Sequence, residues 1–169
     1  MNAKLIIDGK ELNVNISEEI LNTILSRKKT GYERCEPGEM YYLCTDGMSE
    51  ACDFEESGDI VDDCRYKRAT YYSDPTVAEN NARADKLMRQ LRRFAVEHRK
   101  DQLYWARDYC NEKWSIEYDC KNKRLRSNKN WDVRKAFVVY FDSEETVDLA
   151  IKTFHDELTW YFMEYKDSL

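Results

Sequence analysis

Glycine, proline and histidine are scarce in this chain, whose 169 residues include five glycines, two prolines and two histidines. Long apolar runs are missing too, since no stretch approaches the roughly 18 apolar residues that a membrane-spanning helix needs. The first residues, MNAKLIIDGKE, contain no basic region followed by an apolar run, which is the pattern of a secretory signal. We therefore expect a cytoplasmic protein with no membrane partner.

Motifs that fix a reaction are also missing. There is no glycine-rich phosphate loop, HExxH or GxSxG, and His98 and His155 stand among polar neighbours without an accompanying acid-base motif. The six cysteines include no close pair of the kind that holds zinc; they are Cys35, Cys44, Cys52, Cys64, Cys110 and Cys120. In a reducing compartment we expect thiols with packing roles. The sequence therefore predicts a non-enzymatic protein without a metal or cofactor.

The strongest structural signal is a long helix from Pro75 to about Lys100. Asp74 offers a side-chain oxygen to the first free amides, and the fixed φ of Pro75 suits the first helical position. Apolar residues then recur at steps of three and four and define one buried face; they are Val77, Ala78, Ala84, Leu87, Met88, Leu91, Phe94 and Ala95. Such a helix would be about 39 Å long, so we expect it to organise the domain.

The N-terminal segment predicts a small ββα cap over residues 1–29. Residues 4–7 and 12–16 alternate apolar and polar side chains around Asp8-Gly9, a pair typical of tight hairpin turns. Ser17 then caps a predicted short helix that closes at Lys29.

Two further segments share a predicted order of hairpin, third strand and helix. In residues 30–104 the predicted strands are 40–44, 50–54 and 65–72, with residues 55–63 as an acidic loop before the long helix. In residues 105–169 the predicted strands are 113–118, 124–126 and 134–141, and a helix follows from 142 to 162.

The two strand-to-helix junctions match in residue type. Tyr71 to Pro75 and Tyr140 to Glu144 align without a gap, 69 residues apart. This match indicates an internal repeat, and a chance likeness of two junctions is the alternative. The predicted fold is α+β, with the ββα cap followed by two diverged repeats and antiparallel sheet, packed as one compact unit.

Charge is unevenly distributed behind the net charge of −6. Between Cys35 and Cys64 ten residues are acidic and none is Lys or Arg, whereas from Arg65 to Lys135 basic residues outnumber acidic ones by 19 to 10. Pairing between neighbouring faces of the protein would account for this segregation, and so would recognition of a partner by one of the two fields.

Two sets of candidate binding residues follow from this charge pattern. The acidic set is Asp46, Glu50, Asp53, Glu55, Glu56, Asp59, Asp62 and Asp63. The basic set is Arg83, Lys86, Arg89, Arg92, Arg93, Lys121, Lys123, Arg124 and Arg126. The acidic set suits an arginine-lined channel of a partner protein, because such a channel responds to negative charge whatever its chemical source. The basic set suits phosphates, with aromatic residues nearby for stacking.

Residues 30–100 resemble a large, loosely related set of small proteins from phages and prophages of Gram-positive bacteria. The shared features are a GExYY strand, an acidic loop, an RY pair before two aromatics, a capped helix and an LRRFAxE stretch. Trp105, Trp114 and the FVVYFDSEE junction extend the likeness over most of the chain. The resemblance implies action inside an infected bacterium, where inhibitors of host defence, including anti-CRISPR proteins, are a recurrent class. It supplies no functional residues.

We therefore expect an inhibitor that binds a host defence protein, such as a CRISPR nuclease, through the acidic set. The alternative is a nucleic-acid-binding accessory protein that uses the basic set. A homodimer is a further alternative, because the apolar run Trp160-Tyr161-Phe162-Met163 covers too wide an arc for a helix with one buried face.

Overall fold

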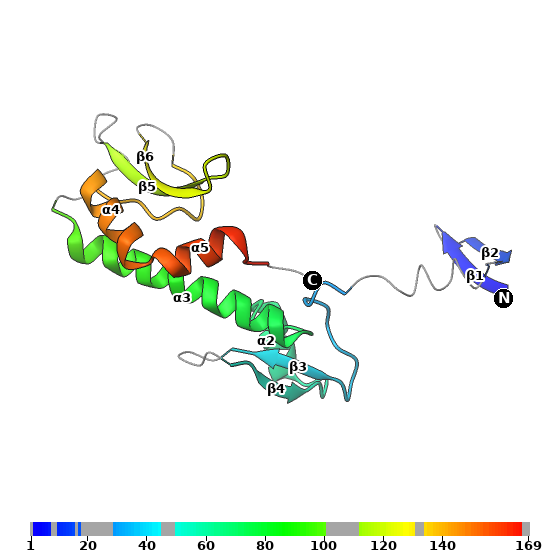
Figure 1. The fold of residues 1–169 in the computed structure, drawn as a ribbon. Coiled ribbons are helices and arrows are strands. Elements are labelled where there is room, and N and C mark those ends of the chain that lie inside the picture. The colour runs from blue at the N-terminus through cyan, green and yellow to red at the C-terminus, as the bar shows by residue number, and fades with distance from the viewer. Residues whose placement is uncertain are drawn as a thin grey trace.

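A computed structural model describes residues 2–7, 10–15, 17, 29–44, 50–100, 112–130 and 134–166. Its elements in chain order are β1 (Asn2–Ile7), β2 (Lys10–Asn15), β3 (Met40–Leu43), β4 (Cys52–Glu55), α2 (Ile60–Lys67), α3 (Pro75–His98), β5 (Lys113–Asp119), β6 (Arg124–Asn130), α4 (Glu144–Thr153) and α5 (His155–Met163). Within the described residues the strands form three separate antiparallel pairs (Figure 1). The predicted mixed α+β class is confirmed.

Helix α3 is the predicted long helix, and it begins at the predicted residue. The Asp74 side chain accepts hydrogen bonds from the amides of Thr76 and Val77, at 2.8 and 3.1 Å. Every apolar residue expected on its inner face is buried except Met88, which is partly buried. The helix therefore has one continuous packing stripe, as the spacing predicted.

Two lobes pack on different parts of α3 (Figure 1). The first lobe, residues 29–72, contains β3, β4 and α2, and its core is a stack of Tyr41 on Tyr71 with ring centroids 4.0 Å apart. The second lobe, residues 112–166, contains β5, β6, α4 and α5. Its core joins Leu87, Leu91, Phe94 and Ala95 of α3 to Phe141, Val147, Ala150 and Leu158. Helices α4 and α5 lie between α3 and the β5–β6 hairpin.

The chain enters α3 and α4 in the same way. Tyr72 forms an antiparallel bridge with Tyr42 of β3, and Phe141 forms one with Trp114 of β5. Two residues after each bridge a side chain caps the following helix, Asp74 for α3 and Ser143 for α4. The two junctions thus share a bridge and a cap at matching positions.

The predicted strand 65–72 is wrong, and the predicted acidic loop 55–63 is confirmed only for residues 56–59. Glu55 ends β4, and α2 begins at Ile60 because Asp59 caps it by accepting from the amides of Val61 and Asp62. After α2 the chain turns at Ala69, whose φ is +55°. Only Tyr72 of the predicted strand pairs with another strand in the described structure. Tyr71 packs in the core of the first lobe, and the single bridge at Tyr72 does not continue into a strand.

The predicted strand 134–141 and the single helix 142–162 also differ from the structure. Only Phe141 of that strand is paired among the described residues, because the chain turns at Ala136 and Phe137. The helix is interrupted at Phe154, which has φ −112° and ψ 24°. This break lets Phe154 pack against Phe94 with ring centroids 5.5 Å apart. In contrast, β6 is longer than the predicted return strand 124–126.

The N-terminal hairpin is confirmed in its backbone pairing. Strands β1 and β2 are antiparallel and Ile7 pairs with Lys10, whereas the predicted turn residues Asp8-Gly9 lie outside the described residues. Residues 18–28, where the cap helix was predicted, also lie outside them. None of the described helices combines the length and apolar character needed to cross a membrane.

The cysteines that the structure describes form no disulfide with one another. Cys35, Cys44 and Cys52 are partly buried, as their predicted packing roles require, whereas Cys64 and Cys120 are exposed. Cys110 lies outside the described residues.

Candidate functional site

Two members of the acidic set lie in the core of the first lobe. Glu56 is 1% exposed and accepts hydrogen bonds from the Tyr71 hydroxyl at 2.7 Å and from Arg34 at 3.0 Å. The Arg34 hydrogen bond lowers the pKa of the Glu56 carboxyl below its usual value. Because the partners are fixed on other elements, this carboxylate joins the segment before β3 to the end of β4.

Asp62 forms a second buried group beside the first. It is 3% exposed and accepts from the Tyr41 hydroxyl at 2.6 Å and from the Ser57 amide at 2.8 Å. The Tyr41 hydrogen bond holds the pKa of the Asp62 carboxyl well below its usual range, and Arg65 also contacts the Tyr41 hydroxyl. Both carboxylates therefore stabilise the stack of Tyr41 on Tyr71 from inside the protein.

The rest of the acidic set is divided between internal and exposed roles. Asp59 caps α2, and Asp63 forms an ion pair with Arg34. Glu50, Asp53 and Glu55 are exposed. Asp46 lies outside the described residues. Of the described members of the acidic set, those that remain as a free surface are thus the residues in and next to β4.

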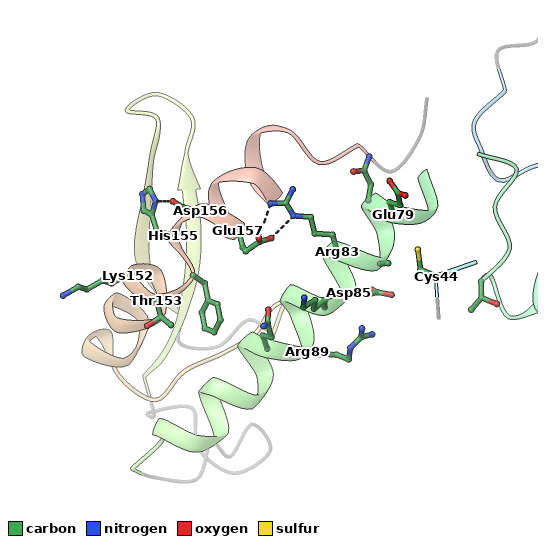
Figure 2. A pocket seen from close by; sticks show the side chains of 16 residues that line it. Cys44, Glu79, Arg83, Asp85, Arg89, Lys152, Thr153, His155, Asp156 and Glu157 are labelled. Atoms are coloured by element: carbon green, nitrogen blue, oxygen red, sulfur yellow. Dashed lines mark hydrogen bonds and ion pairs between the residues drawn. The ribbon is translucent and has the colours of Figure 1, made fainter. Parts of the chain in front are cut away.

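Three basic residues of α3, Arg83, Lys86 and Arg89, line an open groove of about 1100 Å³ (Figure 2). Its floor is one face of α3, with Cys44 and Thr70 on one side and residues 152–157 on the other. Figure 2 shows Arg89 and Asp85 on the side of α3 that faces Cys44. Glu79 and Asp85 line the groove together with Lys86 and Arg89, so its charge is mixed.

Arg83 has a structural role at this groove. Its guanidinium donates to both carboxylate oxygens of Glu157 at 2.9 and 3.1 Å and lies 4.0 Å from the centroid of the Trp160 ring. These contacts attach α5 to α3. Further along α3, Arg92 and Arg93 are exposed, and Arg93 pairs with Glu97.

The β5–β6 hairpin, residues 113–130, carries the other half of the basic set, and we call it the basic hairpin. Lys121, Lys123 and Arg124 are exposed and form no ion pair with any described residue. The two acidic residues on the hairpin are engaged by internal donors. Asp119 accepts from the amides of Lys121 and Asn122, and its hydrogen bonds with Asn122 lower its pKa.

Glu117 is the second acidic residue of the basic hairpin. It accepts from Arg126 at 3.2 Å, from Lys135 at 3.3 Å and from the Asn128 amide group at 2.6 Å. Glu117 is therefore paired with cations, and Asp119 is held by hydrogen bonds from the amides of the turn. The turn of the hairpin carries three exposed cations, Lys121, Lys123 and Arg124, against the one carboxylate of Asp119, and so presents net positive charge to solvent.

The basic residues of α3 and those of the basic hairpin do not form one continuous surface. A shallow depression of about 430 Å³ next to the hairpin is lined by Arg124, Arg126, Asp148 and Lys152, among others. Lys152 borders this depression and the α3 groove, but Figure 2 shows it projecting away from α3. Because α4 and α5 lie between the two regions, the basic hairpin forms a surface of its own.

Sequence reasoning missed Phe137, which is 92% exposed and has φ +60°. The β-favouring run Phe137 to Phe141 concealed it, because the whole stretch 134–141 was predicted to be a strand. The short basic stretch Arg134-Lys135 immediately before it is the signal that it lies at a surface turn.

The predicted dimer face remains a prediction. Trp160 is buried within the protein under Arg83, whereas Phe162 and Met163 are 39% and 56% exposed.

The described residues contain no group of three or more His, Cys, Asp or Glu placed to hold a metal ion. His98 stacks on Phe94, and His155 is an exposed neighbour of Asp156. What the described surface can do is bind anions through the basic hairpin and stack through exposed aromatics.

Comparison with family models, with curated proteins and with solved structures gives no match to this chain.

Proposed function

We propose that this protein is a non-enzymatic binding protein that contacts nucleic acid through the basic hairpin. The observation that supports this proposal is the set of exposed cations at its turn, Lys121, Lys123 and Arg124, beside acidic residues already engaged internally. Phosphate groups can bind these cations even though the protein as a whole is acidic. Salt screens charges more than about 8 Å apart, so distant carboxylates have little effect at the turn.

The expected binding is sensitive to salt. Each phosphate neutralised on a single strand contributes about 0.7 to the slope of log affinity against log salt concentration. Two lost contacts should therefore reduce that slope by about 1.4.

The test is fluorescence anisotropy with a labelled oligonucleotide between about 50 and 200 mM salt. The double variant Lys123→Gln/Arg124→Gln should bind more weakly, with a lower salt slope. The matched control, Lys67→Gln/Arg68→Gln, removes the same charge from the exposed end of α2 and should bind like the wild type. Equal weakening by both variants, or no binding by the wild type, would contradict the proposal.

A second candidate function is inhibition of a host defence protein in the cytoplasm of an infected bacterium, through the remaining acidic surface. The observation that favours it is the pair Asp53 and Glu55, which are exposed on alternate residues of β4, with Glu50 exposed nearby. Carboxylates on one face of a strand can occupy a cationic channel of another protein, including that of a CRISPR nuclease.

This second candidate needs variants that spare the core. Glu50→Gln, Asp53→Asn and Glu55→Gln together should abolish inhibition of a susceptible nuclease in a cleavage assay while leaving the fold intact. Replacing Glu56 or Asp62 would not test it, because both carboxylates are buried. Full inhibition by the triple variant would exclude this surface.

We also infer that the two lobes are diverged copies of one unit, as the sequence predicted. The bridges at Tyr72 and Phe141 and the caps at Asp74 and Ser143 support this inference, because both pairs are separated by the same number of residues. Of the predicted segments, 30–104 and 105–169 would then form one unit held together by α3, whereas β1 and β2 of segment 1–29 lie apart from both lobes (Figure 1).

A further inference from the structure

Phe137 is the most exposed large apolar side chain of the described surface. It is 92% exposed, and its φ of +60° lies in the left-handed region that residues with a bulky side chain rarely adopt. An ordinary turn would place glycine or asparagine at such a position. Because the Phe137 ring is exposed, packing does not offset the cost of this backbone conformation. We therefore expect the ring to contribute to the binding of a partner and not to the stability of the fold.

The turn that carries Phe137 is attached to the basic hairpin. Lys135 donates through its amide to the Tyr140 hydroxyl at 2.8 Å and through its side chain to Glu117 of β5. Glu117 also holds Arg126 of β6. Phe141, at the other end of the turn, bridges Trp114 at the start of β5. The turn is therefore fastened at both ends to the hairpin that carries the exposed cations.

We infer that Phe137 is a stacking platform for an unpaired base, and hence that the preferred ligand of the basic hairpin is single-stranded nucleic acid. This inference rests on the proposed nucleic-acid function. Cations that contact phosphates and an exposed aromatic ring that stacks on a base are the two components of single-strand binding. A duplex keeps its bases stacked inside and offers the ring no face.

The neighbouring charges favour a polyanion over an apolar protein partner. Phe137 follows Arg134 and Lys135, and the nearest acidic group of the hairpin, Glu117, is already bound to two cations. Binding to a polyanion through charge alone, without bases, is an outcome that the test below separates.

The experiment compares the affinities of the full chain for three probes of similar length: oligothymidylate, a DNA duplex, and heparin, which has charge but no bases. Phe137→Ala should weaken oligothymidylate binding by about five-fold or more, since one base-aromatic stack is worth about 1–3 kcal/mol. Binding of heparin should stay within about two-fold. Phe137→Trp should restore oligothymidylate affinity. Val96→Ala removes an exposed apolar side chain from α3 and should change none of the three affinities.

The wild type should bind oligothymidylate more tightly than the duplex, and equal or tighter binding of the duplex would contradict the preference for single strands. If the wild type binds neither oligothymidylate nor heparin, the proposed function itself fails. If it binds oligothymidylate but Phe137→Ala has no effect, or weakens heparin binding equally, the platform inference fails and the function stands. Circular dichroism of each variant confirms that the comparison is made between folded proteins.

Discussion

At the scale of single residues, burial decides what a charge does in this protein. Glu55 and Glu56 are adjacent and chemically alike, yet Glu55 is exposed while Glu56 is enclosed by Arg34 and Tyr71. A charge count along the sequence cannot separate them, because it carries no information about which carboxylate meets a partner from a distant segment.

The first prediction uses this pair. Glu56→Gln should lower the free energy of unfolding by on the order of 3 kcal/mol, because it leaves Arg34 and the Tyr71 hydroxyl without their charged acceptor. Glu55→Gln, the matched control on the neighbouring exposed residue, should change it by less than about 0.5 kcal/mol. Urea denaturation measures both. Similar effects for the two variants would mean that Glu56 is not a core residue.

A second prediction concerns pH. Glu33 accepts from the amides of Thr30 and Gly31 at 2.7 and 3.0 Å, and the Thr30 bond is the main reason that its pKa falls from 4.5 to about 2. The pKa of Glu56 is lowered as well, mainly by Arg34. A pKa lowered by folding contributes stability that is fully present above the unfolded value and is lost as pH falls through the folded value.

The protein should therefore lose stability between about pH 5 and pH 2. Urea midpoints measured at intervals across this range should decline, and Glu33→Gln should decline less than the wild type. A flat profile for the wild type over the same range would show that these carboxyls titrate alike in the folded and unfolded states.

A third prediction concerns Phe137. Phe137→Gly should raise the free energy of unfolding by about 0.5 kcal/mol, because left-handed backbone costs a residue with a side chain roughly 1–2 kcal/mol and the greater freedom of glycine when unfolded offsets part of the gain. Thermal or urea unfolding measures the change. A loss of more than about 0.5 kcal/mol would show that the Phe137 side chain packs in the folded protein.

At the scale of elements, the features predicted correctly are those determined by residues close together in the sequence. The start of α3 was predictable because Asp74 and Pro75 act on the amides next to them, and its inner face because a helix repeats every 3.6 residues. The pairing of β1 with β2 was predictable from Asp8-Gly9 and the alternation on either side. These features need no knowledge of the rest of the chain.

Elements decided by tertiary packing were not predictable in the same way. The sequence assigned 65–72 to a strand, but Arg65 belongs to α2 and Tyr71 fills the first lobe. Phe154 has good helix-forming neighbours, yet the helix stops there because the ring packs on Phe94. The Asp59 cap was missed because the acidic run around it resembled a solvent loop.

A fourth prediction tests the cap of α3. Asp74→Ala should lower the free energy of unfolding by about 1 kcal/mol, because the amides of Thr76 and Val77 lose their acceptor. The same substitution in the exposed middle of the helix, Asp85→Ala, should change it by less than about 0.5 kcal/mol. Chemical denaturation compares the two, and equal losses would contradict the capping role.

At the scale of the whole molecule, α3 holds two lobes with separate cores and separate charged surfaces. The exposed carboxylates of β4 lie on the first lobe and the basic hairpin lies on the second. The uneven charge along the sequence predicted that two fields exist. It could not show that two carboxylates of the acidic set, Glu56 and Asp62, are buried. Nor could it show that α4 and α5 separate the two halves of the basic set.

The central claim is that the basic hairpin and the Phe137 turn are the binding surface, and amide NMR spectra recorded during titration with oligothymidylate test it most directly. The account predicts that chemical-shift changes concentrate in residues 119–126 and 134–138 and saturate together. Changes confined to residues 50–55, to the α3 groove, or to no residues at all would contradict it.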